Sequence, residues 1–175
     1  MADSQQQAVY AWERQWRFWN QAGVPVQYLR RWVRWAERLY RVPPATLLFP
    51  TRSKGVNGNW LPSECAAAAP LGSGAITLRP HHRNVPIALH EVSHWIDGQL
   101  LGHFSGFEGH GPQWLGIYLY LLEKARVAPR VALHESAREA GLKWVSDGRI
   151  GHKAIRQHYR GAVRRAKQEI ELLLA

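Results

Sequence analysis

The chain has 175 residues, which is enough for one globular domain with a substantial core and too few for two domains of ordinary size. A hydrophobic content of 46% with nine tryptophans excludes a disordered or fibrous chain, and the single cysteine excludes an internal disulfide and any zinc site built from several cysteines. The net charge of +10 favours an acidic partner.

The N-terminal half is predicted to form two amphipathic helices and a small sheet. Residues 5–21 carry tryptophans at helical spacing, and a second helix follows Pro25 and ends at Pro43. The period changes between residues 45 and 80, where three short apolar runs are separated by glycine-bearing turns. We therefore predict a small antiparallel sheet of three strands, of which residues 74–80 form the last.

The C-terminal half is predicted to be helical apart from one glycine-rich loop. A helix covers residues 85–101, the loop covers residues 102–111, and a strongly apolar helix begins at Pro112. Two further helices are predicted over residues 129–145 and 151–174, and the last has one apolar stripe with basic residues on the rest of its surface.

The N-terminal sequence gives no sign of export or of membrane insertion. It lacks the basic start and the apolar run of a secretory signal, and no window approaches the apolar length that spans a bilayer. We expect a cytoplasmic, monomeric protein that has no membrane contact.

The segment HEVSHWID, residues 90–97, carries a metal-binding pattern. His90 and His94 are four residues apart, so on a helix their rings point to a common spot with Glu91 beside them. Neutral imidazoles with few ligands favour zinc, and a catalytic zinc takes three protein ligands and a water. Glu91 is predicted to be the general base that deprotonates this water. Asp97, one turn beyond His94, is predicted to support a ligand through its second ring nitrogen.

Several residues could supply the third ligand to the one zinc ion expected per chain. His110, in FEGHGPQW, has the best case, because it stands at the start of a helix that need only pack across the first, and its flanking glycines permit close approach. His103 in the loop is an alternative, as are Glu108 and Glu123, although no supporting pattern surrounds the two glutamates. Residues 134–138, HESAR, repeat the start of the motif with arginine at the ligand position, which predicts surface or capping roles there.

Together, HEVSH at residues 90–94 and HGPQW at residues 110–114 resemble the SprT-like metalloproteases, a family that includes the Spartan-type DNA-dependent proteases. The resemblance implies an α+β, zincin-like domain of the minimal gluzincin type. It also implies the roles of the site residues: His90, His94 and His110 as zinc ligands, Glu91 as general base, and Trp114 as the aromatic residue that fixes the third-ligand helix.

The resemblance extends to the order of elements. Residues 25–127 match the family's helix, three-stranded sheet and active-site helix, which implies a catalytic core there. Residues 1–24 are then an N-terminal helical extension and residues 128–175 a basic helical extension of the single domain 1–175. The cysteine-based zinc ribbon of several relatives is missing from this chain. The implied activity is that of a zinc-dependent endopeptidase on a polypeptide substrate, which could add as a strand beside residues 74–80.

Two strongly basic segments, residues 30–41 and 149–167, allow two interpretations. One interpretation is DNA binding, and the other is a solvated helix face. If the protein binds DNA, proteins attached to nucleic acid become candidate substrates. The DNA contacts predicted in the last helix are Arg156, Arg160, Arg164 and Arg165. Two other functions stay open: a basic nucleic-acid-binding or structural protein with a non-catalytic zinc site, and a metallohydrolase that acts on a small amide.

Overall fold

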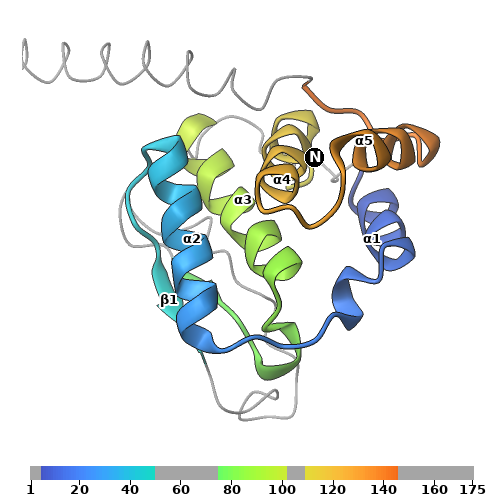
Figure 1. Ribbon diagram of the computed structural model, residues 1–175. Helices are drawn as coiled ribbons and strands as arrows, with labels where there is room; N and C mark the ends of the chain where they lie inside the picture. Colours follow the sequence, from blue (N-terminus) through green and yellow to red (C-terminus); the bar gives the residue numbers. More distant parts are fainter. Residues whose placement is uncertain (1–4, 50–74, 102–108, 146–175) are drawn as a thin grey trace, which may run out of the picture.

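Three helices form the centre of the molecule in the computed structural model: α2 (Val26–Tyr40), α3 (Val85–Leu101) and α4 (Pro112–Lys124). Helix α3 packs against both α2 and α4 and lies between them in Figure 1. Helices α1 (Gln6–Gln15) and α5 (Arg130–Glu139) flank α4 on the side away from α2. The structure is therefore a helix-dominated α+β arrangement in which α3 is the central element.

The structure describes residues 5–49, 75–101 and 109–145. The middle strand of the predicted sheet and the predicted helix over residues 151–174, with Arg156, Arg160, Arg164 and Arg165, lie outside these residues. No helix within the described residues combines the length and apolar content needed to cross a membrane.

The sheet differs from the antiparallel one that we predicted. Strand β1 (Thr46–Leu48) pairs directly with β2 (Ala75–Thr77), and the two run parallel, with Leu47 opposite Ile76. A parallel pair needs a long connection, which residues 49–74 provide. The antiparallel prediction was wrong for this pair, because turn signals between apolar runs suggested neighbouring hairpins. From β2 a short 3-10 turn, η2 (Pro80–His82), leads into α3.

The first and fifth helices are shorter than predicted. Helix α1 ends at Gln15, because Arg17 adopts a left-handed conformation (φ 53°) before the 3-10 turn η1 (Phe18–Asn20). Helix α5 ends at Glu139, two residues before Gly141, whose φ of +70° suits glycine at a helix terminus.

The residues after α5 return to the start of α4. The amide of Val145 donates to the carbonyl of Pro112 at 3.0 Å. The Lys143 amide donates to Gln5 Oε1 at 2.6 Å, and Gln5 Nε2 donates back to the Lys143 carbonyl at 3.1 Å. The segment before α1 and the segment after α5 are thereby joined at the N-terminal end of α4.

The core contains an unusual polar group of residues on α3. Apolar side chains of this helix such as Leu89, Val92 and Ile96 are fully buried, as its apolar composition predicts. His90, Glu91, Ser93 and Asp97 are also buried, and the Ser93 hydroxyl is satisfied by donating to the Leu89 carbonyl at 2.7 Å. Because a buried polar group is costly unless it has partners, it is rarely placed in a core without a role, and His90, Glu91 and Asp97 mark the part of the core where function is to be sought.

Candidate metal centre

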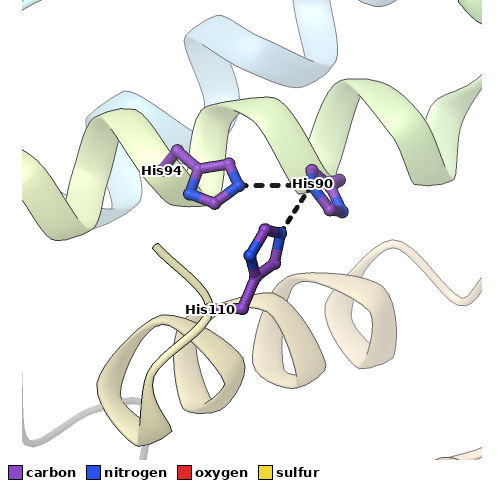
Figure 2. Close-up of side chains that lie close together, drawn as sticks. All are labelled: His90, His94 and His110. Atoms are coloured by element: carbon purple, nitrogen blue, oxygen red, sulfur yellow. Dashed lines mark hydrogen bonds between the residues drawn. The ribbon is translucent and has the colours of Figure 1, made fainter. Parts of the chain in front are cut away.

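Three imidazole rings converge where α3 faces the start of α4 (Figure 2). His90 and His94 come from successive turns of α3, and His110 stands two residues before α4. The Nε2 atom of His90 lies 3.2 Å from Nε2 of His94 and 3.4 Å from Nε2 of His110. Each ring offers one ligand atom, and these three atoms all lie within 4.8 Å of one another.

These distances fit a tetrahedral metal ion. Zinc–nitrogen bonds of about 2.0–2.1 Å at tetrahedral angles place two ligand nitrogens about 3.4 Å apart. The two Nε2 separations of 3.2 and 3.4 Å agree with that value. The three histidines could therefore hold a metal ion, as the sequence predicted, and imidazole nitrogens are donors that suit zinc.

Among the described residues, no carboxylate or cysteine joins the three histidines in this cluster. Glu123, an alternative ligand, lies within 4 Å of Lys124 and Arg130 instead. The other two alternatives, His103 and Glu108, lie outside the described residues.

Helix packing delivers His110 to the pair on α3. Gly111 has an extended backbone and Pro112 occupies the first turn of α4, so the chain enters this helix immediately after His110. Gln5 Nε2 donates to the His110 carbonyl at 3.1 Å, and the packing of α4 on α3 then sets the ring against His90 and His94.

Trp114 contacts all three histidines of the cluster. It is fully buried on α4, and its ring stacks on His94 at a centroid distance of 4.9 Å and an interplanar angle of 24°. The same ring meets His110 edge-on at 4.6 Å and His90 at 4.9 Å. One indole therefore limits the movement of all three imidazoles.

Glu13 is a site residue that was not predicted from the sequence. Its Oε1 lies 2.7 Å from Nδ1 of His90, and both side chains are buried, at 0% and 3% exposure. Glu13 belongs to α1, within residues 1–24, the segment that was predicted to be an N-terminal extension. A signal was available, because Glu13 lies four residues after Val9 and three before Trp16, on the apolar face of the helix, where a lone carboxylate needs a partner.

The pKa values of the two α3 histidines move in opposite directions. Burial lowers the pKa of His94 well below its ordinary value, and the charges of His90 and His110 lower it further. Burial also acts to lower the pKa of His90, but the charge and hydrogen bond of Glu13, and then the charge of Glu91, outweigh it and raise this pKa. His94 is consequently neutral at physiological pH, the form in which an imidazole binds a metal.

Glu91 is buried, at 4% exposure, and close enough for its charge to raise the pKa values of His90 and Tyr118. It therefore lies in the environment of the three histidines, as a general base would require.

Asp97 does not make the contact that we predicted. It is 2% exposed, its Oδ1 has no hydrogen-bond partner, and Nδ1 of His90 is already engaged by Glu13. Within the described residues, the carboxylate that contacts a candidate ligand ring is therefore that of Glu13 on α1.

An open pocket of about 530 Å³ lies beside α1 and η1, and none of the three histidines lines it. Two of its walls, Tyr10 and Trp19, contact candidate ligands: the Tyr10 ring is 5.2 Å from that of His110 and the Trp19 ring is 6.3 Å from that of His90. The remaining lining residues are Arg14, Arg17 and Asn20. The pocket is therefore separated from the three histidines by the rings of Tyr10 and Trp19.

Comparison with known proteins gives no match: no protein-family model, no curated protein and no solved structure matches this chain. The SprT-like resemblance accordingly rests on the two quoted sequence motifs.

Proposed function

We propose that this protein is a zinc-dependent endopeptidase of SprT-like type. The observation that carries the proposal is the convergence of His90, His94 and His110, with Nε2 separations of 3.2 and 3.4 Å, beside the buried carboxylate Glu91. One zinc ion per monomeric chain, held by these three rings, is part of the proposal.

The ligand number favours catalysis over a purely structural site. Structural zinc sites usually have four protein ligands, whereas catalytic sites have three and leave one position for water or substrate. Within the described residues, the cluster contains three. Glu91 adds to this argument, because a structural site has no need of a buried carboxylate next to its first ligand.

The chemistry divides between the ion and the protein. A zinc ion in this cluster would lower the pKa of a water molecule to about 7 and polarise the scissile carbonyl. Glu91 would accept the proton of the attacking water and pass it to the leaving amine. Trp114 would keep the imidazoles in position and exclude water from their faces.

A polypeptide is the proposed substrate. Within the described residues, β2 has a strand partner on one side only, and it leads through η2 into α3, which carries His90. An extended peptide that adds to the other side of β2 would approach the site with its backbone carbonyls presented. The net charge of +10 favours DNA binding and, with it, substrates that are associated with nucleic acid. A cytoplasmic location is part of the proposal.

The experiment that tests this proposal separates zinc binding from turnover. Glu91→Gln is expected to retain about one zinc per chain and to lose at least 100-fold in the rate of cleavage of an unfolded protein substrate, because the ligands remain and the base is gone. His110→Ala is expected to leave the purified protein with clearly substoichiometric zinc by elemental analysis.

The chain contains a matched control in residues 134–138, HESAR. Glu135→Gln changes an exposed glutamate that also follows a histidine, and it is expected to leave zinc content and cleavage unchanged. Full cleavage by Glu91→Gln would refute its role as base. Stoichiometric zinc without cleavage of any polypeptide would favour the alternative, a basic nucleic-acid-binding or structural protein with a non-catalytic zinc site.

A further inference from the structure

We infer that Glu13 is a positioning residue of the metal centre, and that helix α1 is consequently a functional part of it. The inference rests on the metal site of the proposed function, but it does not depend on peptide hydrolysis. It concerns the side of His90 that faces away from the other two histidines.

The two ring nitrogens of His90 have different partners. Nε2 faces His94 and His110 at 3.2 and 3.4 Å, whereas Nδ1 lies 2.7 Å from Glu13 Oε1. A carboxylate at that distance accepts the Nδ1 hydrogen, and the lone pair of the neutral ring is then on Nε2, where the ion would bind. Glu13 therefore selects the tautomer and fixes the plane of the ring.

Glu13 is itself held in place. Trp19 Nε1 donates to Oε2 at 3.2 Å, so the two carboxylate oxygens have different donors. The hydroxyl of Tyr118 donates to the Pro86 carbonyl at 3.4 Å, and burial, followed by the influence of Glu13, raises its pKa. The orientation of the carboxylate is thus set by contacts with His90 on α3 and Trp19 in η1.

The charge of Glu13 requires compensation. The side chain is fully buried, and among the described residues no lysine or arginine pairs with it. Its ion-pair partner is the ring of His90, at 2.7 Å, and a buried carboxylate is strongly disfavoured without such a partner. A divalent cation bound at Nε2 of the same ring would add positive charge on the far side of His90 and strengthen this pairing.

The geometry has a thermodynamic consequence for α1. If a bound ion strengthens the His90–Glu13 hydrogen bond, it stabilises the docking of α1, and by reciprocity the docking of α1 strengthens ion binding by the same factor. Helix α1, which lies in the predicted N-terminal extension, then contributes directly to the affinity for the metal ion.

The test is a measurement of zinc affinity by competition with a chromophoric chelator, with no peptide present. Glu13→Gln keeps the size of the side chain and removes its charge, and it is expected to weaken zinc binding 10–100-fold. The matched control is Glu37→Gln, the same change at another buried carboxylate, which pairs with Arg34 at 2.6 Å on α2. This control is expected to lower stability and leave zinc affinity within twofold.

A second measurement uses the unaltered chain and covers the case in which Glu13→Gln does not fold. In the zinc-loaded protein, nitrogen-15 NMR is expected to show the His90 proton on Nδ1, and amide hydrogen exchange in α1 is expected to slow when zinc is added. Unchanged zinc affinity in folded Glu13→Gln, or the opposite tautomer of His90, would overturn the inference and leave the peptidase proposal standing. If zinc binding depends on Glu13 but the protein cleaves no polypeptide, the role of Glu13 would stand and the peptidase proposal would fail.

Discussion

At the scale of single residues, Asp97 is a buried carboxyl group whose environment opposes its ionisation. Burial raises its pKa from 3.8 to about 7, and its Oδ1 has no hydrogen-bond partner. The folded chain therefore binds a proton at this residue more tightly than the unfolded chain does. It follows that ionised Asp97 weakens the fold, so stability falls as pH rises from about 4 to about 7.

Asp97→Asn is expected to remove this pH dependence. At pH 8 the variant should be more stable than the parent by up to about 4 kcal/mol, because about three pKa units at 1.36 kcal/mol each separate the two states. The difference should shrink towards zero at pH 4, where Asp97 is protonated in the folded chain. Urea unfolding of metal-free protein at several pH values measures it, with the exposed Glu139→Gln as control. A difference that stays constant with pH would contradict the assignment.

Site residues that lie close together in the sequence could be predicted from their spacing. His90 and His94 follow from a four-residue helical interval, and His110 follows from its place at the mouth of the next helix. Glu13 was missed because it meets His90 across 77 positions of sequence. Helical periodicity shows which face of α1 is buried, but it does not show what that face meets.

At the scale of elements, the close packing of α4 against the returning chain depends on Gly116. A Cβ atom at this position would lie 2.7 Å from the carbonyl oxygen of Val145, which is closer than such atoms approach. Because that oxygen belongs to the backbone, the segment after α5 would have to move away from α4. The contact of Lys143 with Gln5 would then be strained as well.

Gly116→Ala is accordingly expected to destabilise the protein by about 1–3 kcal/mol, although alanine is ordinarily the better helix former by about 1 kcal/mol. Chemical unfolding of the variant measures the change. A chain that ends at Leu142 lacks the obstructing carbonyl of Val145. In that shortened chain, Gly116→Ala should stabilise the fold by about 0.5–1 kcal/mol. The same sign in both chains would show that the contact with Val145 is not the cause.

The elements themselves were predictable wherever apolar periodicity is strong. Helices α2, α3 and α4 lie where the pattern placed them, because each has a proline near a terminus and a buried face. The end of α1 was not predictable, since Arg17 adopts a left-handed conformation that arginine rarely takes. The end of α5 did have a signal in Gly141, which the prediction did not use. The parallel pairing of β1 with β2 was also missed, because pairing between distant strands leaves no local pattern.

At the scale of the whole molecule, the net charge of +10 governs which partners approach. The predicted DNA contacts are in the last basic segment, outside the described residues, so DNA binding stays a prediction from sequence. Binding through specific phosphate contacts can be distinguished from a general attraction to a basic surface. A defined set of phosphate contacts gives a defined dependence of affinity on salt concentration.

Replacement of Arg156, Arg160, Arg164 and Arg165 by glutamine is expected to weaken DNA binding and to flatten its dependence on salt. Each lost phosphate contact should reduce the slope of log affinity against log salt by about 0.9. Fluorescence anisotropy with a short duplex at several salt concentrations measures this slope. Replacing four exposed arginines elsewhere in the chain, Arg14, Arg126, Arg130 and Arg138, is the charge-matched control. Equal slopes in the two variants would show that the last segment is only solvated surface.

The Gln5 bridge also has a kinetic consequence. Gln5 contacts the His110 carbonyl across 105 positions of sequence and Lys143 across 138. Contacts between such distant segments form slowly, because the chain must close large loops before it gains from them. The third imidazole is then in place only near the end of folding. We therefore expect any metal ion that the three histidines bind to be taken up late and to be released slowly, at the rate at which the contacts of Gln5 open.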